Sequence, residues 1–293
     1  MESRFFANII LSIGVLITTA SCSPVSSVQM IAGSELHGSH RWEGNIRIAG
    51  DVVFAKDSSL KIQPGTVISF SEAEPGTDLF QDHPHFVGSE LIIKGSVVAE
   101  GTPDAPIKFT SDNSVESPSP WGGVNIMQSP DARFSFCIFE GADSALHIQE
   151  SKVVVRQSLF RSNLVGLRFH SSDIVAEHNN FLQNHTAIRS HFGSPVIRYN
   201  VLKDNRKGLF ITSHPRDFLV SQNNFVNNLD YQVVLGEEVN EDVPLPGNWW
   251  GTTEVKAIES TLFDYRLDSH LGRVRFHPIA GSPISTAGTA WKP

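Results

Sequence analysis

The sequence predicts an all-β solenoid, in which short parallel strands stack coil upon coil, and three repeating rows of residues predict it. An apolar-polar-apolar core recurs at steps of 21, 21, 21 and 24 residues, starting at Leu146, Leu167, Ile188, Leu209 and Val233. Two rows of asparagines keep nearly the same spacing: Asn180, Asn200, Asn224 and Asn248, and Asn163, Asn184, Asn205 and Asn228. A repeat of this length is typical of stacked architectures, in which each unit buries its apolar face only against its neighbours. We expect the asparagines to form internal ladders whose amides satisfy the backbone at the turns.

The N-terminal residues predict an exported protein with a lipid anchor. Residues 5–20 are mostly apolar and too few for a membrane span, so residues 1–21 are assigned as a signal peptide. The run ends Thr19-Ala20-Ser21-Cys22, which resembles the bacterial lipoprotein cleavage box and implies lipidation of Cys22. Residues 22–41 would then be a lipid-anchored tether in the cell envelope, with the outer membrane as the expected location. A cut at a nearby Ala or Ser, leaving a soluble exported protein, is the alternative.

Residues 42–279 are assigned to one β-helix domain with capped ends. Alternating apolar residues with a turn at Pro64-Gly65 predict strands between residues 44 and 70. The pattern returns at residues 91–95 and 107–110 and then enters the repeats. Insertions at residues 71–90 and 111–120 interrupt it.

The C-terminal end changes composition twice. Residues 252–262 predict a short helix or irregular cap, and residues 273–277 predict a last strand. Residues 280–293 are rich in Gly, Ser, Thr and Pro, and we expect a mobile tail there.

Charge and cysteine content exclude two classes of protein. The formal net charge is −8, which argues against nucleic-acid binding because that function needs a basic footprint. The chain has two cysteines. With Cys22 lipidated, Cys137 has no partner, so we expect a buried thiol and no disulfide framework.

Several phrases resemble bacterial exported right-handed parallel β-helix proteins, of the pectate-lyase-like, NosD-like, and carbohydrate-binding and sugar-hydrolase groups. The phrases are residues 60–66 (LKIQPGT), 101–107 (GTPDAPI), 121–123 (WGG) and 248–251 (NWWG). The resemblance implies a right-handed helix over most of residues 42–279. It implies no single activity, because such proteins include lyases, hydrolases, epimerases, adhesins and a periplasmic copper-site assembly factor.

The register also predicts a basic strip on this acidic protein. Neighbouring residues of a strand point to opposite faces, so the core at Leu146 places His147 outside. Stacked coils then bring His147, Arg168 and Arg189 into one outward column, with His170 and His191 in the next. Stacked like charges repel unless an anion lies between them, and arginine forks suit carboxylates. We interpret these five residues as a substrate-binding groove for an anionic polysaccharide. The alternatives are a phosphate or sulfate site, or arginines that extend into water or pair with Glu150 and Asp173.

The sequence leaves catalysis open. Hydrolysis needs two carboxylates facing one bond, and the two outward columns contain none. A lyase or epimerase acting on a uronic-acid polymer needs a base beside a carboxylate-binding group, and His170 or His191 would be that base. A non-catalytic binding protein is the favoured hypothesis.

One further group of residues has metal-ligand character. Asp82, His83 and His85 lie in the first insertion, and an HxH pair on an extended segment projects to one side. An acidic, solvated loop is the alternative interpretation, and we expect no cofactor. A NosD-like role in metal-site maturation, or a structural role at the cell surface, is a further hypothesis.

Overall fold

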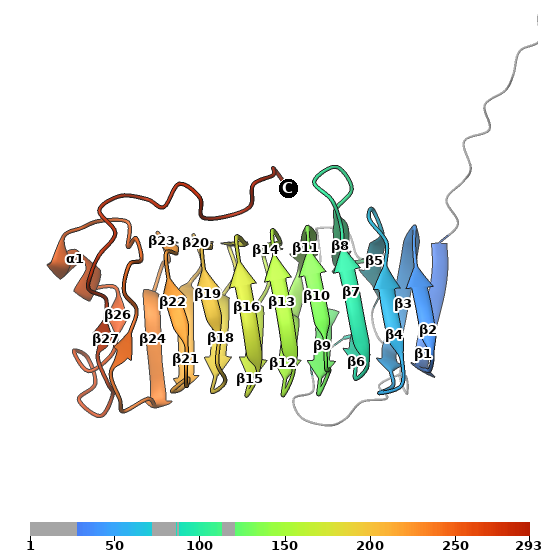
Figure 1. The fold of residues 1–293 in the computed structure, drawn as a ribbon, viewed down its shortest axis with the longest axis horizontal. Coiled ribbons are helices and arrows are strands. Elements are labelled where there is room, and N and C mark those ends of the chain that lie inside the picture. The colour runs from blue at the N-terminus through green and yellow to red at the C-terminus, as the bar shows by residue number, and fades with distance from the viewer. Residues whose placement is uncertain (1–27, 72–85, 87, 113–120) are drawn as a thin grey trace, which may run out of the picture.

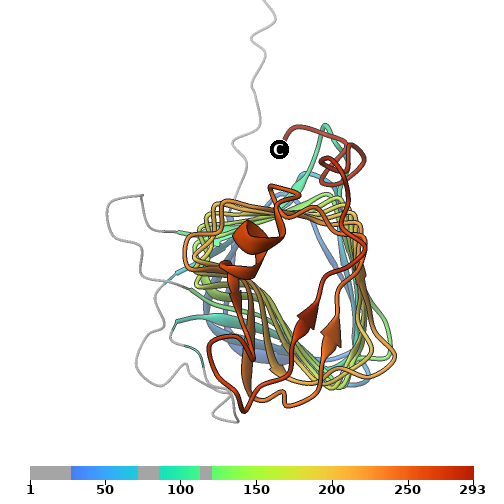
Figure 2. The same ribbon diagram turned by 90° about the vertical axis from the view of Figure 1, so that its left-hand side faces the viewer.

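The computed structural model describes residues 28–71, 86, 88–112 and 121–293, which form one elongated stack of coils (Figure 1). Every coil contributes short strands that pair in parallel with the coils before and after it. Seen along the stack, the coils superimpose on one another (Figure 2). The predicted all-β solenoid is confirmed, and among the described residues the only α-helix is the short α1 (Val255–Glu259) near the C-terminal end.

Three strand rows form the faces of the stack. The groove face, named for the site described below, consists of β6 (Glu90–Ile93), β9 (Trp121–Met127), β12 (Ala142–Gln149), β15 (Val165–His170), β18 (Thr186–His191), β21 (Lys207–Ser213), β24 (Tyr231–Glu238) and β26 (Leu262–Phe263). The second face consists of β5 (Val67–Phe70), β8 (Ile107–Ser111), β11 (Cys137–Glu140), β14 (Leu159–Arg161), β17 (Asn180–Leu182), β20 (Val201–Lys203) and β23 (Asn224–Val226). The third face consists of β2 (Ser39–Trp42), β4 (Ser59–Ile62), β7 (Ser96–Glu100), β10 (Ala132–Ser135), β13 (Lys152–Arg156), β16 (Asp173–Glu177), β19 (Val196–Arg198) and β22 (Leu219–Ser221).

Two long strands join the first two faces. β3 (Asn45–Phe54) pairs with β5 through its first half and with β6 through its second half. β1 (Val28–Leu36) lies against the whole of β3. Strands therefore begin at Val28, inside the segment predicted as a tether, and that prediction is corrected for residues 28–41. Backbone pairing with β3 does not need the clean apolar alternation on which the sequence prediction relied.

Alternate side chains of every strand fill one continuous core. The interior row Phe109, Phe139, Phe160 and Phe181 stacks ring on ring at a centroid spacing of 4.7 Å. This spacing equals the distance between hydrogen-bonded strands, so the rings follow the coils one by one. Cys137 is also enclosed, as predicted, and burial raises the pKa of its thiol.

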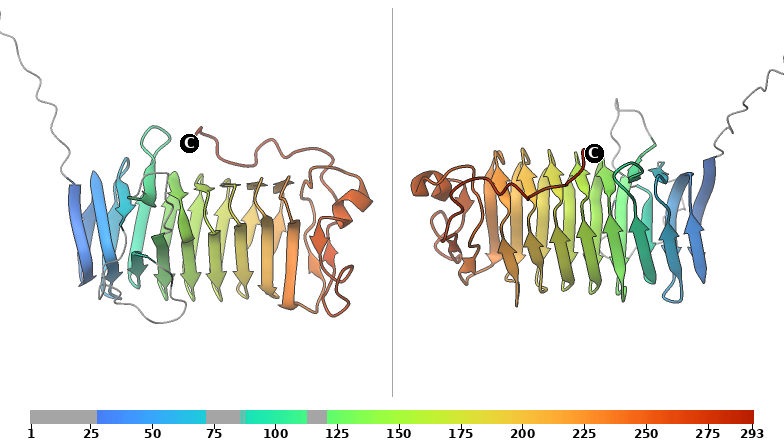
Figure 3. Two further views of the ribbon diagram at one scale, coloured as in Figure 1. Left: turned by 180° about the vertical axis from the view of Figure 1, so that it is seen from behind. Right: turned by 45° about the horizontal axis from the view of Figure 1, so that its top comes forward.

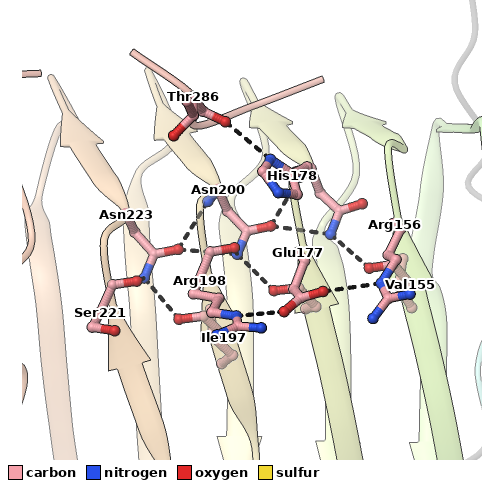
Figure 4. A network of polar contacts seen from close by, with 12 residues as sticks. Val155, Arg156, Glu177, His178, Ile197, Arg198, Asn200, Ser221, Asn223 and Thr286 are labelled. Carbon is pink, nitrogen blue, oxygen red and sulfur yellow. Dashed lines mark hydrogen bonds and ion pairs between the residues drawn. The ribbon is translucent and has the colours of Figure 1, made fainter. Parts of the chain in front are cut away.

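Both predicted asparagine ladders are present, but one of them consists partly of other asparagines than those predicted. The row Asn163, Asn184, Asn205 and Asn228 is confirmed as an internal ladder. In the other row the buried members are Asn179, Asn200, Asn223 and Asn248. Figure 4 shows Asn200 and Asn223 in this row. Asn180 and Asn224 had been predicted instead, because each of them directly follows a ladder asparagine and the spacing alone does not separate the two.

The C-terminal end of the stack is closed by irregular chain. Figure 2 shows α1 lying across this end. A small parallel pair, β25 (Val243–Pro244) and β27 (Val274–Arg275), lies beside it. Asp264 is fully buried there, where it accepts a hydrogen bond from the backbone N–H of Val274 and pairs with Arg266. The predicted C-terminal cap is therefore confirmed.

The last residues run back along the outside of the stack, across several coils (Figure 3). Asn224 exchanges two hydrogen bonds with the backbone of Ile284, and Asn180 donates to Thr289 at 2.9 Å. Further along, the indole N–H of Trp291 donates to the carbonyl of Gln157 at 2.7 Å. The prediction of a mobile tail at residues 280–293 is therefore wrong. Composition alone indicated mobility, but the corners of the coils offer this segment hydrogen-bond partners that are far away in the sequence.

Candidate functional site

The groove face brings the predicted cationic column together. β12, β15 and β18 pair in register, so that His147 lies opposite Arg168 and Arg168 lies opposite Arg189. Phe210 of β21 follows Arg189 in the next coil. The predicted vertical neighbourhood of the two arginines is therefore confirmed. Successive coils remain in phase because the core residues beside them repeat every 21 residues.

A second column runs beside the first. Its members are Gln149, His170, His191 and Thr212, and the rings of His170 and His191 stack at 4.9 Å with an interplanar angle of 13°. His191 Nδ1 lies 3.1 Å from the hydroxyl of Thr212. Burial lowers the pKa of His191, and the neighbouring His170 lowers it further. The second column thus places two imidazoles on the same surface as the two guanidinium groups.

The two columns line one open hollow with a volume of about 300 Å³. All five residues predicted to bind substrate contribute to its wall, together with Gln149, Phe169 and Thr212. The hollow extends over four coils, from β12 to β21, and is open to solvent. The geometry therefore suits an elongated ligand that lies along the stack.

The two arginines of this hollow make no ion pair within the part of the chain that the structure describes. Neither Glu150 nor Asp173 lies within 4.0 Å of them; Glu150 instead accepts a hydrogen bond from Gln128. The Arg168 guanidinium carbon lies 5.3 Å from the centre of the Phe86 ring, and that of Arg189 lies 5.4 Å from Phe210. Aromatic faces attract a cation without neutralising it.

Burial costs Arg168 more than it costs an ordinary surface arginine. Its Nε atom is enclosed and has no hydrogen-bond partner. Burial lowers the pKa of Arg168 to about 10, and the neighbouring Arg189 contributes to this decrease. Asp143 acts in the opposite direction on Arg168, while burial raises the pKa of Asp143 itself. An enclosed N–H without a partner destabilises the ligand-free protein, and a guanidinium donates charge-assisted hydrogen bonds to an anionic ligand.

Sequence reasoning missed the buried support of the column. His147 Nδ1 lies 2.9 Å from Asn125 Oδ1, and Asn125 donates from Nδ2 to Glu90 Oε1 at 2.7 Å. Asn125 lies in the same column as His147, one coil earlier, but nothing in the repeat pointed to Glu90, which precedes the repeats by about two coils. Phe86 was missed because it belongs to the first insertion, where the periodic pattern is lost.

His147 was predicted to lie outside in a basic strip, and this is corrected: its side chain is buried under the hollow and is held neutral. Burial lowers its pKa to about 3, and the nearby Arg168, His170 and Arg189 act in the same direction. A neutral imidazole has one N–H and one nitrogen lone pair, so His147 contributes hydrogen bonding to the hollow and no charge.

Four predicted site residues lie outside the described residues: Cys22, Asp82, His83 and His85. The lipidation and metal hypotheses attached to them are therefore untested. Within residues 28–71, 86, 88–112 and 121–293, no three His, Cys, Asp or Glu side chains are grouped as metal ligands would be. The same residues contain no helix with the length and apolar character of a membrane span.

The comparisons with known proteins agree with the fold. A family model described as the right-handed β-helix region matches residues 92–240, which is just over half of the chain. No curated protein and no solved structure shows significant similarity to it. The matched residues include the groove-face strands from β9 to β24 and both asparagine ladders apart from Asn248. The chain belongs to the right-handed β-helix family.

Proposed function

We propose that this protein binds an anionic polysaccharide along the groove face and does not cleave it. The observation that carries the proposal is the adjacency of Arg168 and Arg189, which form no ion pair with a carboxylate among the described residues; Asp143 influences Arg168 without pairing with it. Adjacent coils are about 4.8 Å apart, and like charges at that distance destabilise a sheet. An acidic group lying between the two guanidinium forks removes this repulsion and gains charge-assisted hydrogen bonds.

A polymer suits the hollow better than a small ion does. The hollow is open and runs across four coils, and the imidazole rings of His170 and His191 line it beside the arginines. Rings of this kind offer flat surfaces to the apolar faces of a sugar, while the arginines bind its acidic groups.

The direct test is retention of the protein by immobilised polygalacturonate, compared with a neutral galactan. We expect wild-type protein to be retained by the acidic polymer only, with retention that weakens as salt is added. Replacing both Arg168 and Arg189 with Ala removes two charge-assisted hydrogen bonds, and we expect affinity to fall about 100-fold or more.

The matched control is the double variant Arg156→Ala and Arg198→Ala, which removes the same charge from the third face. There both arginines pair with Glu177. This control should keep its retention on polygalacturonate. Equal losses in the two double variants, or equal retention on the neutral galactan, would rule out the proposed groove.

Lyase or epimerase activity on a uronic-acid polymer is the second candidate. The stacked pair His170 and His191 favours it, because the two rings lie beside the arginines that would hold a carboxylate. Such a lyase would generate ultraviolet absorbance from unsaturated uronate. That signal should then disappear in His170→Ala or His191→Ala.

We also propose that the protein is exported and held in the cell envelope by a lipid on Cys22. The apolar run before the Thr19-Ala20-Ser21-Cys22 box supports this proposal. Labelled palmitate should enter the full-length protein and not the Cys22→Ser variant.

A further inference from the structure

A buried row of three polar side chains runs behind the arginine pair. Glu90, Asn125 and His147 are each at most 3% exposed and are joined end to end by hydrogen bonds of 2.7 and 2.9 Å. They come from β6, β9 and β12, three successive strands of the groove face. Buried polar groups are costly unless every member of the row is satisfied, so the direction of each hydrogen bond matters.

The direction of the row follows from its first member. In its ionised form Glu90 only accepts hydrogen bonds, so it requires the amide nitrogen of Asn125. The amide oxygen of Asn125 then faces His147, and an oxygen requires a donor. The hydrogen of the neutral imidazole therefore lies on Nδ1, and Nε2 carries the lone pair.

The remaining nitrogen belongs to the hollow. His147 forms part of its wall, and Nε2 makes no hydrogen bond with any described residue. Unlike Arg168 Nε, His147 Nε2 is not a fully enclosed polar atom without a partner. Nε2 is thus the nitrogen of His147 that is left for a ligand in the hollow, whose wall His147 shares with the two arginines.

The backbone beneath the row is shaped to admit it. A Cβ atom at Gly122 would lie 2.4 Å from Cγ of Glu90, so only glycine leaves room for this carboxylate. The carboxylate is therefore accommodated by a specific small residue in the neighbouring strand β9.

We propose that Glu90 and Asn125 fix His147 as the Nδ1–H tautomer, so that the groove recognises an acidic unit that also carries a hydroxyl group. The acid binds Arg168 and Arg189, and the hydroxyl donates to His147 Nε2. A cationic groove without this acceptor would hold any polyanion of suitable spacing. With it, hydroxylated acids such as uronates gain one hydrogen bond that simple polycarboxylates lack. This inference rests on the proposed function for its ligand, whereas the tautomer is a property of the free protein.

The tautomer is tested without ligand by correlating the imidazole nitrogens and protons of the ¹⁵N-labelled full chain. The signals of His147 are identified by their loss in His147→Phe. We expect a protonated Nδ1 and an unprotonated Nε2 in the wild type. In Glu90→Gln the neutral amide allows Asn125 to turn around, and the Nε2–H tautomer should gain population. A protonated Nε2 in the wild type would overturn the inference.

The ligand is tested with polygalacturonate, which has carboxylates and free hydroxyls, and polyglutamate, which has carboxylates only. We expect the ratio of the two affinities to favour polygalacturonate and to fall about three- to tenfold in Glu90→Gln, the range of one hydrogen bond. Gly122→Ala, which displaces the carboxylate by contact, should lower the ratio in the same way and stands in if Glu90→Gln does not fold.

The outcomes separate the two proposals. A ratio that does not change while the tautomer does would overturn the role of His147 in recognition. Retention of neither polymer would overturn the proposed function and the hydroxyl assignment together, and the spectrum would still decide the tautomer.

Discussion

Two rows of identical side chains run along this stack: a buried asparagine ladder and the arginine pair of the groove face. The asparagines satisfy one another's hydrogen bonds, whereas the arginines repel each other. In the buried ladder, the Asn200 amide nitrogen donates to Asn223 Oδ1 at 3.0 Å, and Asn200 Oδ1 accepts from the backbone N–H of Asn179 at 2.9 Å. An amide has both donors and an acceptor, so an asparagine can stack on a copy of itself. A guanidinium has donors only. Arg168 and Arg189 therefore require hydrogen-bond acceptors and negative charge that neither arginine can supply to the other.

On the third face, a carboxylate lies between two arginines of the neighbouring coils and pairs with both of them. Arg156, Glu177 and Arg198 occupy three successive coils, and the carboxylate accepts from Arg156 Nε at 3.0 Å and also binds Arg198 (Figure 4). Both arginines lower the pKa of Glu177, although its burial opposes them. Similarly, Glu140 lies between Lys108 and Arg161 on the second face. Among the described residues, no carboxylate lies between the arginines of the groove column, and this distinguishes the candidate site from the structural ion pairs.

The largest effect on the free energy of unfolding is expected from interrupting the buried asparagine ladder. Asn200→Leu keeps the volume but removes the hydrogen bonds that Asn200 makes with the backbone N–H of Asn179 and the carbonyl of Ala176 inside the stack. At about 1–3 kcal/mol for each unsatisfied buried group, we expect a loss of about 4 kcal/mol in the free energy of unfolding, measured by urea denaturation.

The matched control for this variant is Asn180→Leu. Asn180 has the same sequence spacing as the ladder but lies outside it, where it binds Thr289. We expect this change to cost about 1 kcal/mol or less. Similar losses in the two variants would contradict the assignment of the ladder to Asn179.

A smaller effect is expected when acid protonates His147 in the unfolded chain while the folded column keeps it neutral. The pKa of His147 is about 3 in the folded protein against 6.5 for the ordinary side chain. Between these values the unfolded chain binds a proton that the folded protein does not, so the contribution to stability is complete above pH 6.5 and is lost as the pH falls toward 3.

This pH effect is measured by urea denaturation of the wild type and His147→Phe at pH 7 and pH 5. At about 1.4 kcal/mol per pKa unit, the wild type should lose about 2 kcal/mol more than the variant over this interval. The quantity compared between the two proteins is the change in the free energy of unfolding from pH 7 to pH 5, so a different absolute stability of the variant does not affect the result. Parallel losses in both proteins would show that His147 is not held neutral.

The smallest expected effect is a gain in stability. Arg189→Glu converts the groove column into the pattern of the third face, with a carboxylate beside Arg168. We expect the ligand-free protein to gain about 0.5 kcal/mol, because a repulsion is replaced by a partly exposed ion pair.

The same variant should lose its retention on polygalacturonate completely. Arg189→Gln, which removes the repulsion and adds no pair, should have a stability between those of the wild type and Arg189→Glu. Loss of stability in Arg189→Glu would show that the two arginines do not repel each other in the free protein.

The sequence was sufficient for what repeats, because each coil buries the same pattern against its neighbours. The steps of 21 residues placed Arg168 next to Arg189 and His170 next to His191, and the structure confirms both pairs. Spacing was insufficient where two candidates are adjacent, as in Asn179-Asn180, because a one-residue difference decides which side chain points inward.

By itself, the sequence determined the fold, the core rows and the residues of the two outward columns, since these depend only on period and alternation. The tertiary structure alone decided which charges remain without partners, how Glu90 reaches His147 through Asn125, and where the C-terminal segment lies. The contacts of Glu90 with Asn125 and of Trp291 with Gln157 join residues 35 and 134 positions apart and follow no repeat. Such contacts depend on the distances between side chains in the folded stack, and the order of residues along the chain does not encode those distances directly.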